Sequence, residues 1–218
     1  MKDGFIRVAA ATPEIQVADC DYNRKQVERM LKEAWEQKAR MIVFPELCMT
    51  GYTCGDLFLQ ELLLAGCVDA LEKLLEASRD MDIIGVVGMP LTVNGKLYNV
   101  AVVFKEGVIL GVVPKTFIPN YSEFYEARHF ERGPKKPILI TLAGQETWFG
   151  THLLFACTNM PGLVIGGEIC EDLWAPNPPS ISHALAGATM IFNVSASDET
   201  TGKDVYRKEL VNSQSARL

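Results

Sequence analysis

The N-terminal part of the chain alternates between short apolar runs and longer amphipathic stretches. Phe5 to Ala11 and Met41 to Phe44 are apolar runs typical of buried strands. Between them, apolar residues recur at helical spacing from about Tyr22 to Arg40, and the Asp21 carboxylate can accept hydrogen bonds from the first backbone N–H groups of such a helix. The pattern therefore predicts a strand, a helix capped by Asp21 and a second strand.

The next part of the chain changes from helical to strand periodicity. A second helix is predicted over about Leu57 to Ser78, and Asp82 to Met89 returns as a strand. Asn94-Gly95 is a strong hairpin signal, and Glu106-Gly107 is a second one. The arms of these hairpins are Leu97 to Phe104 and Val108 to Val113. A β-α-β-α-β beginning that continues as antiparallel hairpins predicts an α/β fold with a mixed sheet and helices outside it.

The C-terminal half returns to strands separated by polar connections. A polar, aromatic loop is predicted over about Asn120 to Arg128. The other predicted elements are one hairpin arm over Trp148 to Cys157, a turn over Asn159 to Gly162, a strand over Leu163 to Ile169, a helix over about Pro178 to Ala186, a strand over Met190 to Val194 and a helix from near Asp204. That last helix reaches Leu218 with no glycine or proline to end it, so we expect the chain to be part of a longer protein.

Composition restricts the class of protein. The 218 residues are 48% hydrophobic and 22% charged, as in ordinary globular proteins, and their number fits one large domain or two small ones. A net charge of −6 without a basic cluster argues against nucleic acid as a partner. The longest mostly apolar stretch, Leu57 to Leu75, is interrupted by charged residues, and the N-terminus carries no signal-peptide pattern. We therefore expect a cytoplasmic protein without membrane contact.

The cysteines and histidines do not form a metal-binding pattern, so no metal is expected. The six cysteines are Cys20, Cys48, Cys54, Cys67, Cys157 and Cys170. No two of them are spaced C-x-x-C, and none lies near a histidine at the spacing of metal ligands. The three histidines, His129, His152 and His183, offer few candidates for a cysteine–histidine dyad. Reduced thiols fit the cytoplasm, and neither G-x-G-x-x-G nor a P-loop motif occurs in this chain.

Cys170 is the first candidate for chemistry. The apolar strand Leu163 to Ile169 leads directly into it, and a proline-rich segment after it starts a helix at about Pro178. At such a strand-to-helix turn the sulfur is raised out of the sheet, near backbone N–H groups that can bind an oxyanion. The alternative is that Cys170 is a small buried hydrophobic residue, because free cysteines are among the most buried residues.

Glu46 and Lys115 occupy similar positions at the ends of apolar strands. Ligands bind at the carboxyl ends of parallel strands, so these two residues and Cys170 are candidates for one site. Taken singly, Glu46 could be a turn acid and Lys115 a solvated lysine. Together the three supply a base, a cation and a nucleophile, which acyl transfer through a thioester requires. A pair between Glu46 and Lys115 would also leave neither buried charge alone.

Four groups of residues resemble motifs of the nitrilase, or carbon–nitrogen hydrolase, superfamily. They are Phe44-Pro45-Glu46-Leu47 with Thr50-Gly51-Tyr52; Pro114-Lys115-Thr116 with Pro119-Asn120-Tyr121 and Glu123 to Arg128; Glu168 to Trp174; and Asn193 to Ser197. These motifs are spread in family order over nearly the whole chain. The tyrosine-rich loop and the Cys-Glu-Asp-Leu-Trp run are most similar to the glutaminase domains of glutamine-dependent NAD+ synthetases.

The resemblance implies a fold and a set of catalytic roles. The fold would be a nitrilase-like α-β-β-α sandwich. Glu46 would be the general base, Lys115 would stabilise the tetrahedral intermediate, and Cys170 would attack the side-chain amide of glutamine. A second glutamate assists in this superfamily. Glu126 matches its position best, with Glu123 as the nearby competitor.

The resemblance also implies residues that bind glutamine. The matching positions are Tyr121, Ser197 and Lys203, with Tyr52, Glu171 and Trp174 as expected walls of the pocket. An acid such as Glu171 and a base such as Lys203 complement the charged α-amino and α-carboxylate groups of glutamine. Because Glu171 and Asp172 adjoin Cys170, they would disfavour its thiolate unless they point away.

By this resemblance, residues 1–218 form an incomplete glutaminase domain, truncated at the C-terminus. A separate ATP-dependent synthetase domain would follow it, and ATP and Mg are expected only there, with no cofactor in this chain. The intact protein would convert deamido-NAD+, ATP and glutamine to NAD+. The expected partners are L-glutamine, the absent synthetase domain and further copies of the same chain in a homo-oligomer.

Two other functions stay open on the sequence. The chain could be a stand-alone amidase or N-carbamoyl hydrolase of the superfamily, which a downstream synthetase domain would exclude. It could also be a nitrilase-like binding or assembly module without activity. The complete set of Glu46, Lys115 and Cys170 argues against the second possibility.

Overall fold

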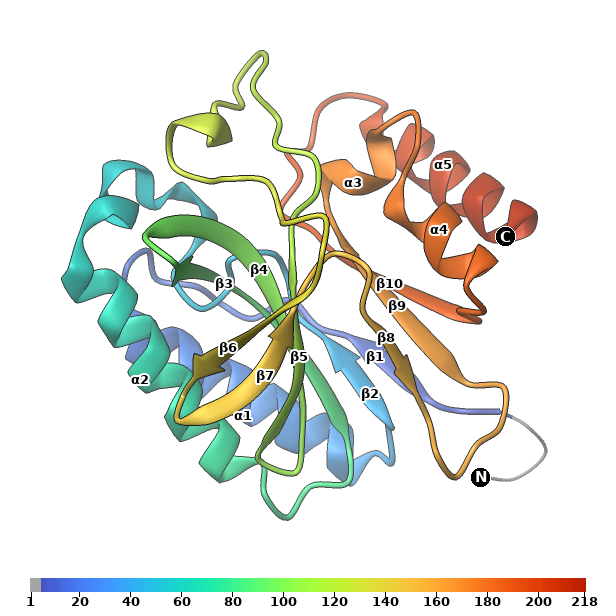
Figure 1. The fold of residues 1–218 in the computed structure, drawn as a ribbon, viewed down its shortest axis with the longest axis horizontal. Helices are drawn as coiled ribbons and strands as arrows, with labels where there is room; N and C mark the ends of the chain where they lie inside the picture. The colour runs from blue at the N-terminus through green and yellow to red at the C-terminus, as the bar shows by residue number, and fades with distance from the viewer. Residues whose placement is uncertain (1–4) are drawn as a thin grey trace.

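Two β-sheets lie between two layers of helices in the computed structural model, which describes residues 5–218 (Figure 1). The larger sheet contains, in spatial order, β1 (Val8–Ala10), β2 (Met41–Val43), β3 (Ile84–Val93), β4 (Lys96–Lys105), β5 (Val108–Pro114), β7 (Gln145–Phe149) and β6 (Ile138–Leu142). The smaller sheet contains β10 (Met190–Val194), β9 (Val164–Ile169) and β8 (Leu154–Ala156). Both sheets mix parallel and antiparallel pairs, which confirms the predicted mixed α/β fold.

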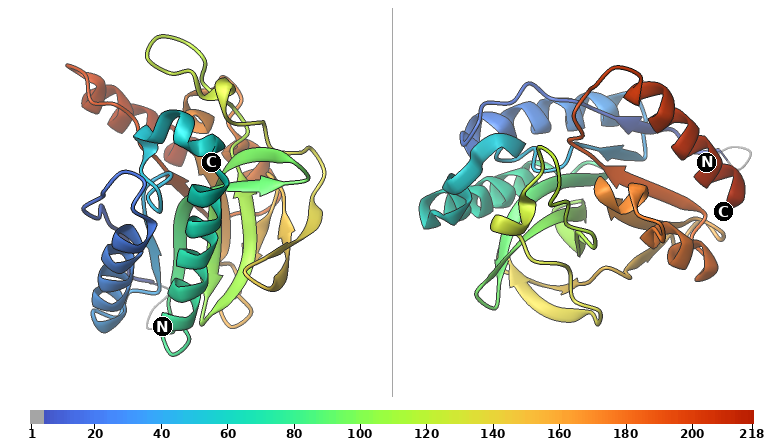
Figure 2. Two further views of the ribbon diagram at one scale, coloured as in Figure 1. Left: turned by 90° about the vertical axis from the view of Figure 1, so that its left-hand side faces the viewer. Right: turned by 90° about the horizontal axis from the view of Figure 1, so that it is seen from above.

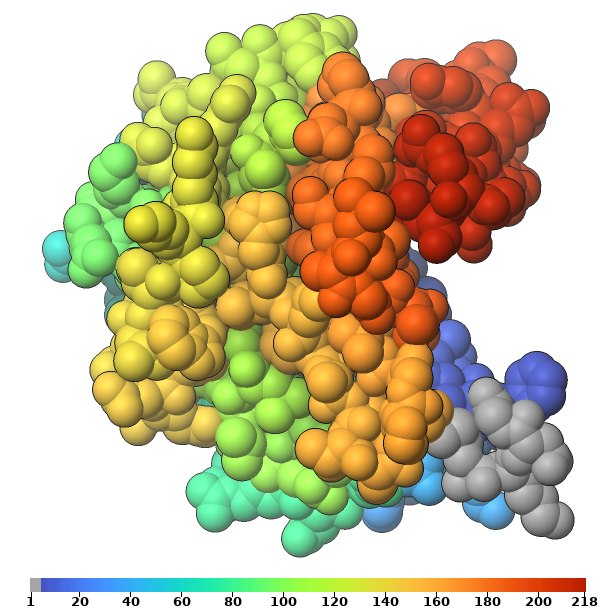
Figure 3. Space-filling model, turned by 45° about the vertical axis from the view of Figure 1, so that its right-hand side comes forward, coloured from blue at the N-terminus to red at the C-terminus, as the bar shows by residue number. Residues whose placement is uncertain are grey.

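The helices cover the outer faces of the two sheets. α1 (Cys20–Glu36) and α2 (Glu61–Ala77) pack on the larger sheet, while α3 (Glu171–Trp174), α4 (Pro179–Leu185) and α5 (Lys203–Arg217) lie on the side of the smaller sheet (Figures 1 and 2). In the space-filling view, α5 stands out from the body of the molecule beside α4 (Figure 3). Two 3₁₀ helices, η1 (Tyr52–Leu59) and η2 (Glu126–Arg128), lie in the connections. The layers give the α-β-β-α order that the resemblance implies.

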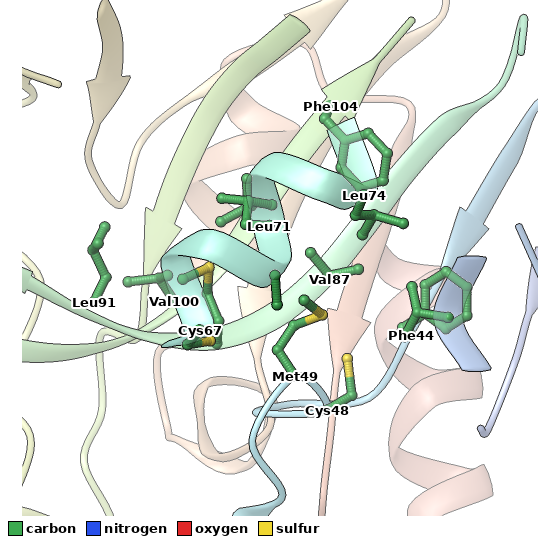
Figure 4. Packing of buried hydrophobic residues seen from close by; sticks show 14 of the residues in the cluster. Phe44, Cys48, Met49, Cys67, Leu71, Leu74, Val87, Leu91, Val100 and Phe104 are labelled. Carbon is green, nitrogen blue, oxygen red and sulfur yellow. The ribbon is translucent and has the colours of Figure 1, made fainter. Parts of the chain in front are cut away.

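Each side of the larger sheet buries its own apolar core. On the outer side, Leu71 and Leu74 of α2 face Val87 and Phe104 of the sheet (Figure 4). On the inner side, the core between the two sheets contains Met41, Val86, Ala101, Val103, Val113, Ile165, Ile169, Phe192 and Val194. Because β2, β3, β4 and β5 are covered on both faces, they carry the nearly continuous apolar runs that the sequence shows.

The boundaries of the two long helices differ from those predicted. α1 begins at Cys20, and the carboxylate that caps it belongs to Asp19, which accepts the Tyr22 N–H at 2.9 Å; the prediction of Asp21 as the cap is wrong. The second helix begins at Glu61 instead of Leu57. The residues before it form η1, where Gly55 has a φ of 56° that breaks the helical path.

The prediction of one hairpin arm from Trp148 to Cys157 is wrong. This region contains the end of β7 in the larger sheet and all of β8 in the smaller one, so the chain changes sheets between Phe149 and Leu154. The hairpin of β6 and β7 turns at Ala143-Gly144, a pair without the usual asparagine or aspartate signal. In contrast, the turns predicted at Asn94-Gly95 and Glu106-Gly107 are confirmed.

Among the described residues, none of the helices combines the length and the apolar character that crossing a bilayer requires.

Gly88 of β3 allows the segment after β2 to lie directly on the sheet. A Cβ added at Gly88 would lie 2.3 Å from the Leu47 nitrogen and 2.6 Å from the Pro45 oxygen. We therefore expect Gly88→Ala to lower the free energy of unfolding by about 1–3 kcal/mol, measured by urea denaturation. Gly66→Ala is the matched control, because an added Cβ in the middle of α2 meets nothing within 4 Å and the helix gains roughly 0.5–1 kcal/mol. Equal effects of the two substitutions would contradict this account.

Candidate active site

Three strands end at the same place and carry the three residues that the sequence singles out. Glu46 lies beyond the end of β2, Lys115 directly follows β5, and Cys170 directly follows β9 of the other sheet. Lys115 Nζ is 2.7 Å from Glu46 Oε1, and both side chains are fully buried. Ser195 and the adjacent Ala196 link Cys170 to this pair, since Ser195 Oγ donates to Cys170 Sγ at 3.3 Å and the Ala196 N–H donates to Glu46 Oε2 at 3.1 Å. The structure therefore brings the three residues together.

Glu126 supplies a second carboxylate to the lysine. Its Oε1 and Oε2 atoms accept hydrogen bonds from Lys115 Nζ at 2.8 and 2.9 Å. Glu123 is exposed, so Glu126 is the better match to the assisting glutamate. Burial acts to lower the pKa of Lys115, but the charges of Glu46 and Glu126 outweigh it and hold that pKa above its usual value. The lysine therefore remains a cation.

Glu46 is held in place by groups from three segments. Its Oε1 accepts a hydrogen bond from Asn99 Nδ2 at 2.7 Å as well as the one from Lys115, and its Oε2 accepts the Ala196 N–H at 3.1 Å. The backbone from Pro45 to Leu47 approaches Gly88, whose lack of a side chain makes room for it. These contacts fix the carboxylate in one orientation.

Cys170 occupies a strained turn between β9 and α3. Its φ of 45° and ψ of −98° are unusual for a residue with a side chain, and Ser195 Oγ donates a hydrogen bond to its sulfur at 3.3 Å. Burial, reinforced by the charge of Glu46, raises the pKa of Cys170 to about 12 despite the opposing charge of Lys115. The thiol is therefore protonated at neutral pH, and attack by the sulfur requires a base beside it.

Asp172 is a structural residue of the site whose role the sequence analysis misses. Its carboxylate accepts N–H groups of Thr116 at 3.0 Å, Phe117 at 2.7 Å and Ile169 at 2.9 Å. It therefore ties the segment after Lys115 to the strand before Cys170, across the two sheets. Burial raises the pKa of Asp172 to about 7, against the opposing effect of the backbone N–H groups. The carboxylate is turned toward the backbone, which answers the concern that it would oppose a thiolate.

A polar cavity of about 320 Å³ opens on Cys170. Its walls include all the predicted glutamine-binding residues except Tyr52, namely Tyr121, Glu171, Trp174, Ser197 and Lys203. Tyr121 donates its hydroxyl to Glu171 Oε1 and Oε2 at 3.0 and 2.9 Å. Lys203 pairs with Asp198, and its ammonium lies 5.7 Å from the Phe124 ring centre and 5.4 Å from that of Trp174. The cavity is thus lined by several carboxylates, Glu171 and Asp198 among them, and by the ammonium of Lys203.

Tyr52 lies behind Glu126 and not in the wall of this cavity. Its hydroxyl donates a hydrogen bond to Glu126 Oε1 at 2.7 Å, and its ring lines a separate cavity of about 200 Å³. Burial and the charge of Glu126 raise the pKa of Tyr52, so the phenol keeps its proton and acts as a donor. Tyr52 therefore contacts the site through Glu126, and its role as a wall of the glutamine pocket stays a prediction.

The histidines take no part in the arrangement around the sulfur. In the described residues, the side chain that hydrogen-bonds Cys170 Sγ is Ser195. His129 contacts Asp56, and His183 is buried with Nε2 3.0 Å from the Thr151 oxygen. The base available to the thiol is therefore a carboxylate, and a cysteine–histidine dyad is not formed.

A buried thiol beside a carboxylate and a fixed cation is the set of groups found in hydrolases that attack a carbonyl carbon with a cysteine sulfur. The chain belongs to the carbon–nitrogen hydrolase family, whose model matches residues 7–217.

The chain is also similar to particular known proteins. It is 44% identical over 214 residues to the glutamine-dependent NAD+ synthetase of Mycobacterium bovis, a match that covers 98% of this chain and 32% of that protein. Its fold matches a glutamine-dependent NAD+ synthetase from Cytophaga hutchinsonii with a TM-score of 0.84 and 28% identity, over 96% of this chain and 33% of that one. An amidase from Nesterenkonia sp. shares the fold at 19% identity, with a TM-score of 0.74 over 98% of this chain and 73% of that one.

The pKa of Cys170 gives a direct test of the role of Glu46. Glu46→Gln removes the base and a negative charge, while Lys115 stays beside the sulfur. We expect amide hydrolysis to be lost, while the pKa of the thiol falls from about 12. The pH dependence of Cys170 alkylation by iodoacetamide, located by peptide mass spectrometry, measures that shift. A profile that stays in place or moves to higher pH would show that Glu46 does not act on this thiol.

Removal of the buried cation should destabilise the fold. Lys115→Met leaves the neighbouring Glu46 and Glu126 without their shared partner, at a cost of about 3–5 kcal/mol at neutral pH. Burial raises the pKa of Glu126 and the Lys115 charge opposes that rise, so without the ammonium this pKa should rise further above that of the unfolded chain. The variant should therefore regain stability as the pH falls and Glu126 takes up a proton. Urea denaturation at two pH values measures this. Lys73→Met, which breaks an exposed pair with Asp69, should change stability by less than about 1 kcal/mol, and a similar loss in both variants would contradict the account.

Proposed function

We propose that this chain is a glutaminase domain that releases ammonia from the side-chain amide of L-glutamine for glutamine-dependent NAD+ synthesis. The observation that carries the proposal is the cavity on Cys170, whose acid and cation face the same space as the nucleophile. The 44% identity to the glutamine-dependent NAD+ synthetase of Mycobacterium bovis supports the same reaction.

The buried charges assign a role to each group in the first half of the reaction. Glu46 takes the proton from the Cys170 thiol as Sγ attacks the amide carbon of glutamine. The oxygen of the tetrahedral intermediate becomes negative, and the Lys115 ammonium stabilises it. Glu46 then gives its proton to the amide nitrogen, the carbon–nitrogen bond breaks, and ammonia leaves. A γ-glutamyl thioester remains on Cys170.

The second half of the reaction uses the same groups. Glu46 takes a proton from a water molecule, which attacks the thioester carbon, and Lys115 again stabilises the negative oxygen. The carbon–sulfur bond breaks, the sulfur recovers the proton from Glu46, and glutamate leaves. Glu126 supports both halves because it binds the Lys115 ammonium together with Glu46.

The cavity walls match the charged end of glutamine. The Glu171 carboxylate, oriented by Tyr121, can pair with the α-amino group. Lys203, held against the faces of Phe124 and Trp174, can pair with the α-carboxylate, with Ser197 as a neutral donor beside it. A simple amide has neither charge, so these contacts would select glutamine.

The chain spans about a third of the length of the synthetases that it matches. We propose that the ammonia is used by an ATP- and Mg-dependent synthetase domain that converts deamido-NAD+ to NAD+. Residues 5–218 hold all six cysteines as free thiols, which fits the cytoplasmic location that we propose. Assembly into a homo-oligomer stays a prediction.

A diazo-ketone analogue of glutamine tests the proposal on the intact protein. We expect one adduct, located on Cys170 by peptide mass spectrometry, and protection by glutamine. Glu171→Gln should raise the glutamine concentration needed for half-protection by about tenfold or more, because a hydrogen-bonded charge pair is lost. Cys170→Ala should abolish the adduct, whereas Cys157→Ala should leave it unchanged.

The same experiment separates the competing functions. Protection by simple amides that equals protection by glutamine would favour a stand-alone amidase. An adduct spread over several cysteines without protection would favour a binding module and would contradict the proposed glutaminase.

A further inference from the structure

Glu126 belongs to an element that is too short to hold its own position. η2 is three residues long, and a single helical turn is unstable by itself because it fixes several dihedral angles for one hydrogen bond. Contacts with other elements must therefore place the Glu126 carboxylate. Two of these contacts, with Lys115 and Tyr52, lie inside the site already described.

A third set of contacts lies outside the site and centres on Asp56. Its Oδ1 accepts a hydrogen bond from Arg128 Nε at 2.7 Å, and its Oδ2 accepts one from Arg128 Nη2 at 2.8 Å. His129 Nε2 lies 3.1 Å from Oδ1. Arg128 is the last residue of η2, and His129 follows it. A guanidinium that binds a carboxylate through two parallel hydrogen bonds fixes orientation as well as distance.

Asp56 lies on the same element as Tyr52, the residue that hydrogen-bonds Glu126. η1 and η2 are therefore joined twice, once through Tyr52 and Glu126 and once through Asp56 and Arg128. Phe58 adds an apolar contact between η1 and the two residues that follow η2, since its ring packs edge-on against those of His129 and Phe130. The two side-chain contacts, Tyr52 with Glu126 and Asp56 with Arg128, and the packing of Phe58 together hold η2 against η1.

Asp56 is well separated from the chemistry. Its side chain is 63% exposed, and that of Arg128 is 56% exposed. Asp56 does not line the cavity that opens on Cys170. An exposed ion pair contributes little to overall stability, so a substitution here can alter the position of η2 without unfolding the protein.

We propose that Asp56 is a positioning residue for the reaction: by binding Arg128 and His129 it holds η2 in the place that keeps Glu126 on Lys115. The inference rests on the proposed glutaminase function where turnover is measured. Loss of the Asp56 contacts would let η2 shift. Glu126 would then move away from Lys115, and Lys115 would shift relative to Cys170. Small displacements of catalytic groups are costly, because a misplacement of about 1 Å can slow a reaction by roughly a hundredfold.

Asp56→Asn in the intact protein tests this, because it keeps the shape of the side chain and removes its charge. We expect kcat for glutamine hydrolysis to fall by about tenfold and KM to stay within about twofold, since the walls of the glutamine cavity are untouched. Arg128→Gln should have the same effect. The double variant should be no slower than either single variant, because both changes break the same ion pair between Asp56 and Arg128. Asp69→Asn, which breaks the exposed pair with Lys73 on α2, is the matched control and should leave kcat unchanged.

A second readout does not depend on glutamine. If Glu126 moves away, the net charge beside Cys170 becomes more positive, and the pH profile of its alkylation by iodoacetamide should move to lower pH in Asp56→Asn. If the wild-type protein does not hydrolyse glutamine, the proposed function fails and this profile alone decides the role of Asp56. If Asp56→Asn has the kcat of the wild-type protein and the same pH profile of Cys170 alkylation, the inference is overturned. Losses that add up in the double variant, or a kcat that falls only in proportion to the folded fraction, would also overturn it.

Discussion

The site depends on a lysine ammonium buried between two carboxylates. Taking a charge out of water costs several kcal/mol, which only close partners can offset. Lys115 finds them in Glu46 and Glu126, at 2.7 and 2.8 Å. The three residues come from the end of β2, the end of β5 and η2, so satisfying one charge fixes three segments relative to each other. The same arrangement places a fixed ammonium and a fixed carboxylate beside the buried thiol of Cys170.

The second sheet brings the Cys170 thiol to this charged centre. Cys170 is presented by β9, and Asp172 joins its strand to the segment after Lys115 through three backbone N–H groups. The charge cluster and the thiol are thus positioned by different sheets and held together by one buried carboxylate. Because burial raises the pKa of the thiol to about 12, reactivity depends on this alignment and not on a free thiolate.

The sequence predicts the strand ends well because apolar runs and the polar residues that follow them are local features. Glu46, Lys115 and Cys170 each end such a run, and the structure confirms that the first two pair. The role of Asp172 and the contact between Asp56 and Arg128 depend on segments far apart in the chain, which no local pattern reveals. The error over Trp148 to Cys157 has a similar cause, since an extended run does not show where the chain crosses from one sheet to the other. The cap at Asp19 is missed because two nearby aspartates fit the same signal.

The central claim is that Cys170 forms a γ-glutamyl thioester. Its most direct test is to mix the intact protein with glutamine, quench it with acid during turnover, and analyse the Cys170 peptide by mass spectrometry. The account predicts a glutamyl group on Cys170 that appears with ammonia release and disappears when glutamine is exhausted. Ammonia release without this group on Cys170, or continued hydrolysis by Cys170→Ala, would contradict it.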